Sequence, residues 1–263
     1  MIARHGLDAR RALGQHFLLD ANLTARIARQ AGELAGRHVV EVGPGPGGLT
    51  RALLAGAAAD VTAVEIDPRA VAAIEELAVV SPRLRVVAAD ALALDLAALV
   101  PPPRQIVANL PYNVASPLLV GWLRQAAQWE RLTLMFQLEV AERICAAPGS
   151  AAYGRLAVLA QWVAVAELRL RVPPAAVVPP PSVWSAVVVL TPHGAQPDPL
   201  LFAAMERLTA AAFGQRRKML RGALRALDGA ALLAAAGIDP ARRAETLDVA
   251  EFDRLARLLA ARR

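Results

Sequence analysis

The feature that most constrains the fold is the alternation of short apolar runs, rich in β-branched residues, with longer segments rich in alanine and leucine. Strands that are apolar throughout and joined through helices form a parallel sheet covered on both faces. We therefore expect an α/β, Rossmann-like fold with a doubly wound, mostly parallel seven-stranded sheet. The expected strands are 38–43, 60–67, 83–90, 104–110, 131–137, 166–172 and 185–192, and the expected helices around them are 47–57, 68–78, 116–128, 138–147 and 153–165.

Prolines mark several boundaries of these elements. Pro68 stands near a helix start, and Ser116 followed by Pro117 reads as a capping residue with proline at the first helical position. The loop "VPPAAVVPPPSV", residues 172–183, separates the last two strands, since its prolines lack the N–H groups that a ladder requires.

The composition changes after residue 194. Residues 195–263 show only helical patterns, with turn signals at Gly229, Gly237 and the pair Asp239-Pro240. We predict a first domain at 1–194 and a small all-α C-terminal domain at 195–263.

A glycine-rich loop, "EVGPGPGGLT", follows the first expected strand. Gly43, Gly45 and Gly48 nominally match a dinucleotide-binding spacing, so a nicotinamide-dependent oxidoreductase is one alternative. Pro44 and Pro46 argue against it, because each removes a backbone donor that a pyrophosphate would need. The loop suits an uncharged or cationic ligand at the carboxyl edge of the sheet.

Two carboxylates follow the next two expected strands. Glu65 lies where a carboxylate accepts ribose hydroxyls, and Asp90 is placed to accept from an adenine amine. Alone, Glu65 also fits a solvated strand end and Asp90 a helix cap. Together with the glycine loop they indicate S-adenosylmethionine, which combines adenosine, free ribose hydroxyls and a sulfonium cation without any phosphate.

The fourth expected strand ends in "NLPY". Methyl transfer to an exocyclic adenine amine requires its nitrogen to become more tetrahedral, and hydrogen-bond acceptors on the two N–H groups favour that change. We predict that the Asn109 side-chain oxygen and the Leu110 carbonyl supply these acceptors, that Pro111 orients the carbonyl, and that Tyr112 stacks on a flipped base. A turn is the simpler reading of the same residues.

The sequence shows no metal-binding pattern and no segment typical of a membrane protein. The four histidines are scattered, and the single cysteine, Cys145, excludes a disulfide framework. No secretory signal is visible, and the apolar stretch at 156–168 is too short to span a bilayer. We expect a cytoplasmic protein without a metal or membrane association.

Motifs distributed over residues 10–250 resemble the KsgA-type rRNA adenine N6-dimethyltransferases, with the erythromycin-resistance rRNA methylases as cousins. They are "LGQHFLLD", "EVGPGPGGLT", "VEID", "AAD", "NLPYN", "YGRL", "PPPSVWSAVV" and "AFGQRRKML", in this order. The resemblance implies a class I methyltransferase that adds two methyls to each of two adjacent adenosines near the 3′ end of 16S rRNA, during late 30S assembly. It also implies cofactor contacts from His16, Leu18, Gly43, Glu65, Asp90 and Asn109.

The chain departs from this family's pattern at several positions. Val177 stands where the family usually has a phenylalanine that stacks on the target base, and Trp184 stands where an aspartate is common. Leu13 and Leu138 replace a frequent aromatic residue and a frequent lysine. With valine in place of that phenylalanine, the target base loses one of the aromatic rings expected to stack on it.

Positive charge is concentrated in the C-terminal region. Residues 196–263 hold 12 Arg and Lys against 8 Asp and Glu, although the whole chain carries only +6. The segment 215–225 has a helical pattern that aligns Arg217, Arg221 and Arg225 on one face. We predict RNA binding here by Arg216, Arg217, Lys218, Arg221 and Arg225, with a second basic patch at Arg4, Arg10 and Arg11; a solvated arginine face is the alternative.

We predict an rRNA adenine dimethyltransferase that acts as a monomer on 16S rRNA within the 30S subunit or its precursor. Gly45 joins the expected cofactor contacts as part of the glycine loop. The second alternative is a non-catalytic ribosome-assembly or RNA-binding paralogue that retains the fold, against which Glu65, Asp90 and Asn109 argue.

Overall fold

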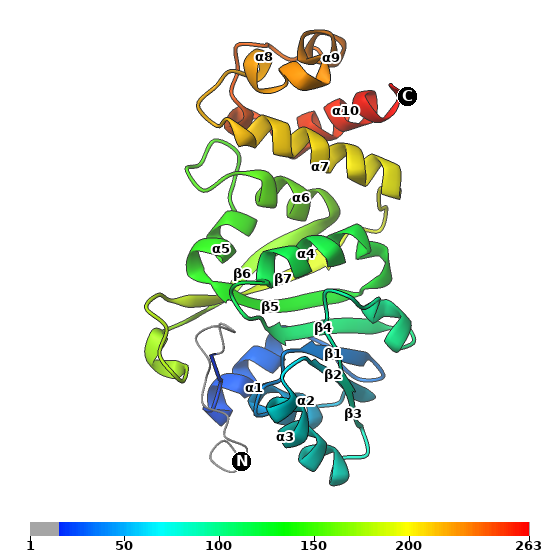
Figure 1. The fold of residues 1–263 in the computed structure, drawn as a ribbon, viewed down its shortest axis with the longest axis vertical. Coiled ribbons are helices and arrows are strands. Elements are labelled where there is room, and N and C mark those ends of the chain that lie inside the picture. Colours follow the sequence, from blue (N-terminus) through cyan, green and yellow to red (C-terminus); the bar gives the residue numbers. More distant parts are fainter. Residues whose placement is uncertain (1–15, 263) are drawn as a thin grey trace. The chain divides into compact units, whose positions relative to one another are not determined.

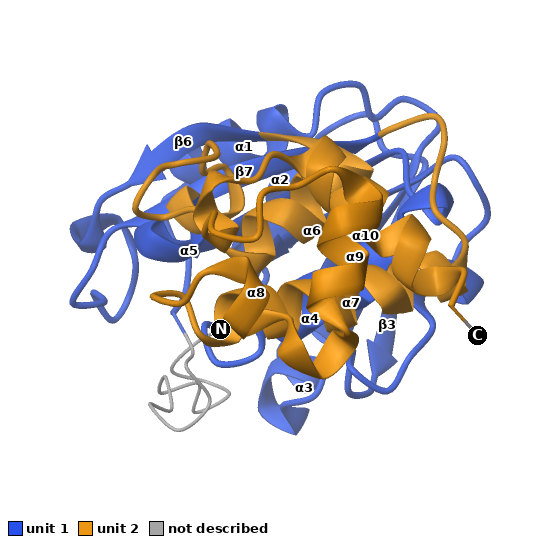
Figure 2. Cartoon of the chain, turned by 90° about the horizontal axis from the view of Figure 1, so that it is seen from above, with its two compact units in different colours: residues 1–141, 167–192 blue, residues 142–166, 193–263 orange. Residues whose placement is uncertain are grey.

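The computed structural model describes residues 16–262, which pack as two compact units (Figure 2). The first comprises residues 16–141 and 167–192, and the second comprises 142–166 and 193–262. Packing therefore groups 142–166 with the C-terminal helices, whereas the division into functional domains at residue 194 stays a prediction. The basic patch at Arg4, Arg10 and Arg11, together with Leu13, lies outside the described residues.

A seven-stranded sheet forms the centre of the first unit (Figure 1). Its strand order is β3-β2-β1-β4-β5-β7-β6, and the pairs from β3 to β5 are parallel while β7 runs antiparallel to β5. The expected mostly parallel sheet is confirmed. The strands are β1 (His38–Val42), β2 (Asp60–Glu65), β3 (Leu84–Ala88), β4 (Arg104–Asn109), β5 (Arg131–Gln137), β6 (Ala164–Val172) and β7 (Ser185–Pro192).

The register of the strands brings distant residues to one edge of the sheet. Asn109, the last residue of β4, pairs with Met135 of β5, and Gln137 at the end of β5 pairs with Ser185. Because β7 is antiparallel, its first residue lies at the edge where the parallel strands end. This edge is the usual ligand-binding side of an open α/β sheet.

Five helices belong wholly or mainly to the first unit, and two of the expected helix starts can be compared with them. Asp67 caps α3 through the Arg69 amide with Pro68 in the first turn, as expected from the proline. The prediction for Ser116 was wrong, because α4 begins one residue earlier and Ser116 lies within its first turn. The helices are α1 (Ala21–Gln30), α2 (Gly48–Leu54), α3 (Pro68–Val79), α4 (Ala115–Arg124) and α5 (Leu138–Ile144).

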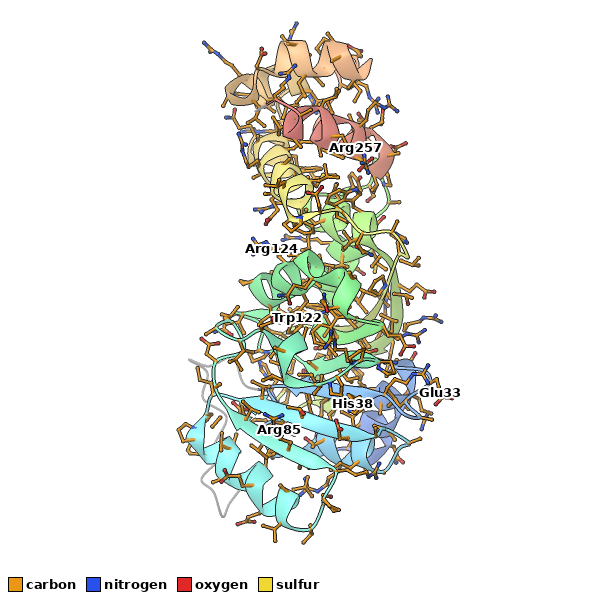
Figure 3. The ribbon with its side chains drawn as sticks, turned by 90° about the vertical axis from the view of Figure 1, so that its right-hand side faces the viewer. Glu33, His38, Arg85, Trp122, Arg124 and Arg257 are labelled. Atoms are coloured by element: carbon orange, nitrogen blue, oxygen red, sulfur yellow. The ribbon has the colours of Figure 1, made fainter. Side chains whose placement is uncertain are left out.

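Both faces of the sheet are buried. One apolar cluster joins α1 and α2 to alternate strand residues such as Val39 and Val107, while Val40 and Val42 on the other face of β1 are also buried. On α4, Trp122 is buried whereas Arg124, two residues on, is exposed (Figure 3). Because both faces of the sheet are covered, its strands are almost continuously apolar rather than alternating.

The start of α2 tolerates no side chain at Gly48. A Cβ atom built there would lie 1.9 Å from the carbonyl oxygen of Leu18, which is backbone and cannot rotate away. Gly48→Ala is therefore expected to lower the free energy of unfolding by about 1–3 kcal/mol. The measurement is urea denaturation followed by circular dichroism.

Gly121 provides the matched control, because it lies inside α4 and a Cβ built there meets nothing within 4 Å. Gly121→Ala should stabilise the protein by about 0.5–1 kcal/mol through lower chain entropy in the unfolded state. Equal stability of the two variants would contradict the close approach of Leu18 to α2.

The second unit is helical around an aromatic centre. Phe213 and Phe252 stack with ring centroids 5.6 Å apart, and Tyr153 is fully buried with its ring 6.1 Å from that of Phe213. Its helices are α6 (Arg155–Val163), α7 (Pro199–Gly214), α8 (Leu220–Ala223), α9 (Gly229–Ala236) and α10 (Val249–Ala260).

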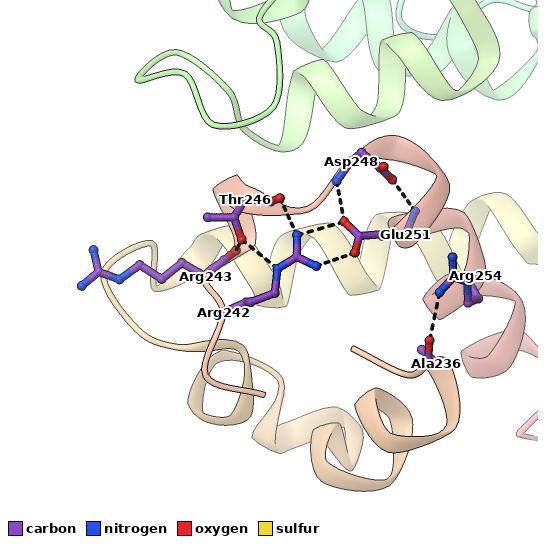
Figure 4. A network of polar contacts seen from close by, with 7 residues as sticks. All are labelled: Ala236, Arg242, Arg243, Thr246, Asp248, Glu251 and Arg254. Carbon is purple, nitrogen blue, oxygen red and sulfur yellow. Dashed lines mark hydrogen bonds and ion pairs between the residues drawn. The ribbon is translucent and has the colours of Figure 1, made fainter. Parts of the chain in front are cut away.

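A capping network stabilises the start of α10 (Figure 4). The Asp248 side chain accepts from the Glu251 amide, and the Glu251 carboxylate accepts from the Asp248 amide. The Arg242 guanidinium donates to both carboxylate oxygens of Glu251 and to the Thr246 carbonyl. This arrangement holds the pKa of Glu251 below its usual value, chiefly through the hydrogen bonds from Arg242.

No helix within residues 16–262 is long and apolar enough to cross a membrane. The same residues contain no group of three or more His, Cys, Asp or Glu side chains arranged to hold a metal ion.

Candidate active site

A cavity of about 210 Å³ lies at the carboxyl edge of β1, β2 and β4. The structure brings six of the predicted cofactor residues to its wall, although they are spread over more than 90 positions of the sequence. Leu110 and Pro111 also line it. The six are His16, Gly43, Gly45, Glu65, Asp90 and Asn109.

The glycine loop offers no backbone donor to a phosphate between Gly43 and Gly47. The Gly43 amide donates to Val64, the Gly45 amide to Glu65 and the Gly47 amide to Pro44, and the two intervening prolines have no N–H. All three glycines have positive φ, between 55° and 83°, which favours glycine. The loop therefore presents a close, donor-free surface, as the two prolines indicated.

Glu65 is buried and anchors this loop. Its Oε2 accepts from the Gly45 amide at 3.2 Å, while Oε1 accepts from the amides of Ile66 and Asp67 at 2.9 Å each. Burial raises the pKa of Glu65, and the three backbone donors offset part of that rise. A carboxylate has about four acceptor positions, so roughly one stays open, which is enough for one ribose hydroxyl and not for both.

Asp90 is exposed just after the end of β3. Its Oδ1 accepts from the Leu92 amide at 2.9 Å, which caps a turn rather than a helix. The residue also lines the cavity, so its second oxygen remains available to a ligand amine.

Sequence reasoning missed the apolar walls of the cavity. Ile66 and Leu92 line it and are 61% and 50% exposed. Each follows shortly after a predicted carboxylate, Glu65 or Asp90. Exposed apolar side chains beside those carboxylates suit a flat aromatic ring whose polar edge faces the acids.

Asn109 has a defined amide orientation. Its Nδ2 donates to the His16 carbonyl at 2.8 Å, and since that carbonyl only accepts, the amino group must face it. The side-chain oxygen points the other way, and no hydrogen bond within residues 16–262 engages it. Asn109 lines this cavity and the smaller one beside it, and its Oδ1 is a free acceptor among the described residues.

Tyr112 lies beside the cavity and does not line it. Its ring is 5.0 Å from the His16 ring at an angle of 34°, and its hydroxyl shares a 2.7 Å hydrogen bond with Ser185. Burial raises the pKa of Tyr112, partly offset by the bond to Ser185. The ring is thus held at one face and at its hydroxyl.

Leu18 falls in a smaller neighbouring cavity of about 20 Å³ instead of the main one. Glu41 lies on that cavity too, is 1% exposed, and its Oε2 has no hydrogen-bond partner within residues 16–262. Burial raises the pKa of Glu41 to about 8, and the nearby charge of Glu65 adds to the rise. Sequence reasoning missed Glu41, although an acid inside an apolar strand was the signal.

We expect Glu41 to make stability depend on pH. Between an unfolded-state pKa near 4.5 and a folded-state pKa of about 8, the folded protein holds a proton that the unfolded chain has lost. The free energy of unfolding therefore falls as pH rises through this window, by up to about 1.4 kcal/mol per pH unit. Glu41→Gln removes this contribution, so its stability relative to the native protein should increase from pH 5.5 to pH 7.5.

Urea denaturation of both proteins at several pH values measures this difference. Glu75→Gln, which removes an exposed carboxyl on α3, serves as the control and should follow the native curve. Parallel curves for Glu41→Gln and the native protein would contradict a buried neutral carboxyl.

The proline-rich loop is joined to the segment that carries His16. The His16 Nδ1 bonds to the Pro179 carbonyl at 2.9 Å, and Phe17 and Val178 exchange two backbone hydrogen bonds. Val177 is fully buried in the apolar cluster with Val107 and does not face the cavity.

The basic segment of the second unit differs from the prediction. Residues 215–218 form a turn and a bend, α8 has only four residues and a short 3₁₀ turn follows, so Arg217, Arg221 and Arg225 do not share one continuous helix face. The turns arise after Gly214 ends α7, and Met219 then forms a bridge with Arg243. Arg217, Lys218, Arg221 and Arg225 are exposed.

Two arginines of this region have unexpected positions. Arg216 donates to the carbonyls of Ser150 and Ala151, at 3.5 and 2.7 Å, and so holds the loop before α6. Arg243, which sequence reasoning missed, is exposed, lies next to Lys218–Met219 through the bridge, and extends away from the Arg242 network (Figure 4).

Comparison with known proteins identifies the family. A model of the family described as "Ribosomal RNA adenine dimethylase" matches residues 6–261, almost the whole chain. The chain belongs to the ribosomal RNA adenine dimethylase family. The resemblance to the KsgA-type enzymes is confirmed, and the chain is an rRNA adenine dimethyltransferase that uses S-adenosylmethionine.

Relatives of this dimethylase are similar along nearly their full lengths. A protein named "Ribosomal RNA small subunit methyltransferase A" from Gluconobacter oxydans is 67% identical over 258 residues, which cover 98% of this chain and 85% of that protein. A protein of the same name from Rhodospirillum rubrum is 54% identical over 259 residues, covering 98% and 90%.

Solved structures show the same fold. The 23S rRNA methyltransferase ErmE is 28% identical, with a TM-score of 0.69 and coverage of 92% of this chain and 99% of that one. A dimethyladenosine transferase from Plasmodium falciparum is 24% identical with a TM-score of 0.76, covering 91% and 95%; this likeness concerns the fold.

The cavity of the dimethylase fits S-adenosylmethionine. The donor-free glycine loop suits a nucleoside without phosphate, and the partly free carboxylates of Glu65 and Asp90 suit hydroxyl and amine donors. Ile66 and Leu92 offer apolar surface for an adenine ring. Among the described residues its wall has carboxylates and no lysine or arginine, which also suits a sulfonium cation.

Proposed function

We propose that this dimethylase transfers methyl groups to the N6 amines of two adjacent adenosines near the 3′ end of 16S rRNA, giving N6-dimethyladenosine. It acts in the cytoplasm, as a monomer, on the 30S subunit late in assembly. The names of the relatives, which specify the small ribosomal subunit, support this choice of substrate.

The observation that carries the chemistry is the orientation of Asn109. Its amino group donates to the His16 carbonyl, which leaves the side-chain oxygen Oδ1 free. Because Oδ1 only accepts and Asn109 lines the cavity, its partner there is a hydrogen-bond donor such as the N6 amine. Accepting that N–H, together with the Leu110 carbonyl accepting the second, favours a tetrahedral nitrogen with an available lone pair. Bound S-adenosylmethionine supplies the electrophilic methyl carbon.

The remaining roles follow from this arrangement. Pro111 restricts the backbone beside Leu110, and Tyr112 presents a ring to the base. Glu65 and the glycine loop hold the cofactor, with His16, Leu18 and Asp90 around it. None of these roles requires a metal ion.

The exposed basic residues of the second unit support RNA docking. Arg217, Lys218, Arg221 and Arg225 carry no ion pair within the described chain, and phosphates of a structured RNA are natural partners for such a surface. Arg216 contributes by holding its loop in addition to any RNA contact.

The decisive experiment offers the native protein unmethylated 30S subunits and labelled S-adenosylmethionine, then maps modified nucleotides by mass spectrometry. We expect N6-dimethyladenosine at two neighbouring positions near the 3′ end of 16S rRNA. Label in 23S rRNA alone, or no label, would contradict the proposal.

Loss of basic residues should weaken docking without affecting the cofactor. The double variant Arg217→Ala, Lys218→Ala is expected to bind 30S subunits less tightly and to lower the slope of log affinity against log salt by about 1 for each contact removed. The dissociation constant for S-adenosylhomocysteine should stay unchanged. Filtration binding at several salt concentrations measures the slope.

The matched control removes two other exposed arginines of the same unit. Arg207 of α7 and Arg257 of α10 (Figure 3) are exposed, and Arg207→Ala with Arg257→Ala changes the net charge equally. Equal loss of affinity in both double variants would indicate a general charge effect and contradict a docking surface at 215–225.

A further inference from the structure

Ser185 lies close to the predicted acceptor site although it is 73 residues from Tyr112 in the sequence. The site residues Asn109 to Tyr112 follow β4, and β5 separates β4 from β7 in the sheet. Tyr112 therefore reaches across the end of β5, a span of roughly 10 Å between outer strands. Its hydroxyl ends 2.7 Å from the Ser185 hydroxyl.

The antiparallel direction of β7 makes this contact feasible. Ser185 is the first residue of the strand and pairs with Gln137, the last residue of β5. The Leu138 amide donates to the Trp184 carbonyl at 2.8 Å, which fixes the chain just before Ser185. Ser185 is 0% exposed, so its hydroxyl is shielded from water, and Tyr112 is the partner that satisfies it.

The hydrogen bond restricts the position of the Tyr112 ring. One face of the ring already lies against His16, with centroids 5.0 Å apart. A phenol held at its hydroxyl and at one face leaves only the opposite face for a base to stack on. Val177 is buried, so it provides no second face for that base.

We propose that Ser185 is a positioning residue for methyl transfer, which holds the Tyr112 ring through its hydroxyl so that the target adenine stacks in one orientation. The proposal rests on the proposed function of the site. Ser185 does not line the cavity, and in this proposal it acts through its hydrogen bond to the Tyr112 hydroxyl.

A double-mutant cycle with Ser185→Ala and Tyr112→Phe tests this role. Tyr112→Phe keeps the ring and removes only the hydroxyl, so both single variants break the same bond. We expect each to lower the single-turnover rate of methyl transfer by about 3- to 10-fold. Because the second change then has nothing left to remove, the double variant should be no slower than the slower single variant.

Two further measurements separate positioning from general damage. The dissociation constant for S-adenosylhomocysteine should change less than about twofold in all three variants, since neither residue lines the cavity. Thr133→Val is the matched control: Thr133 is a buried hydroxyl on β5 without a hydrogen-bond partner in the described chain, and its loss should leave the transfer rate unchanged.

A spectroscopic readout reports the bond without any activity. The chain has two tyrosines, so ¹³C labelling at the ring carbon that bears the hydroxyl gives two resonances, and Tyr112→Phe assigns them. Ser185→Ala should shift the Tyr112 resonance only. Tyr153 is an internal control, because its buried hydroxyl has no partner within residues 16–262.

The outcomes distinguish the two proposals. An unmoved Tyr112 resonance in Ser185→Ala, or multiplicative rate effects in the double variant, overturns the positioning role while methylation by the native protein stands. Absence of rRNA methylation by the native protein overturns the proposed function, and the positioning role with it.

Discussion

We expect Asn109→Ala to lower the rate constant for methyl transfer by about 100- to 1,000-fold, the effect of removing one preorganised hydrogen-bonding group from a reacting centre. The native amide is held by its amino group on the His16 carbonyl, which fixes the orientation of Oδ1 in a residue that lines the cavity. Alanine cannot accept a hydrogen bond from the N6 amine, so the amine nitrogen keeps its lone pair delocalised in the ring. A water molecule in the space left would be free to rotate and would not replace a fixed acceptor.

Single-turnover transfer to 30S subunits, with saturating protein, measures this loss apart from product release. Affinity for the subunit should remain close to that of the native protein, because the docking surface that we propose lies in the second unit. Asn22→Ala, which removes an asparagine from the first turn of α1, is the matched control and should be fully active. An Asn109→Ala protein with native rates would refute the acceptor role.

We expect Glu65→Gln to weaken binding of S-adenosylhomocysteine by about 10- to 100-fold, since hydrogen bonds to a charged group are worth roughly 1.5–3 kcal/mol each. The native carboxylate accepts from three backbone amides, one of them in the glycine loop. A glutamine has one accepting oxygen, and its amino group would face a donor. The loop must shift, and the open acceptor position for a ribose hydroxyl is lost as well.

Isothermal titration calorimetry with S-adenosylhomocysteine measures this affinity without any catalytic step. Glu75→Gln again serves as the control, because it removes an equal charge from the surface of α3. Subunit affinity should be unaffected in both variants. Native cofactor affinity in Glu65→Gln would show that the carboxylate neither holds the loop nor contacts the ligand.

The backbone elements of the first unit could be predicted because their signals are local. Continuous apolar runs set the strands within one or two residues, and Pro68 marked the start of α3. The prediction of a cap at Ser116 was wrong because α4 begins after Val114, which makes no side-chain cap. Ser116 therefore lies inside the helix instead of before it.

The basic segment shows where periodicity misleads. A spacing of four in Arg217, Arg221 and Arg225 indicates a helix face, yet charged surface residues contribute no burial that would hold a helix in place. The Met219–Arg243 bridge and the turns at 215–218 follow from packing with residues some 24 positions away. No local pattern encodes that pairing.

The candidate site, like the fold, has features that could be predicted from the sequence and others that depend on the tertiary structure. The chemistry of its parts was readable in the sequence, because a carboxylate, an amide or a proline keeps its properties in any fold: Glu65, Asp90, Asn109 and the donor-poor glycine loop all lie on one cavity, as expected. Only the tertiary structure decided which atoms of those groups are already bonded, so that Glu65 retains one open acceptor position and the Asn109 oxygen is the free end of its amide. The buried state of Glu41 and Val177 and the bond from Tyr112 to Ser185 were likewise decided there. They depend on sheet order and strand direction, which bring together residues that no spacing along the chain connects.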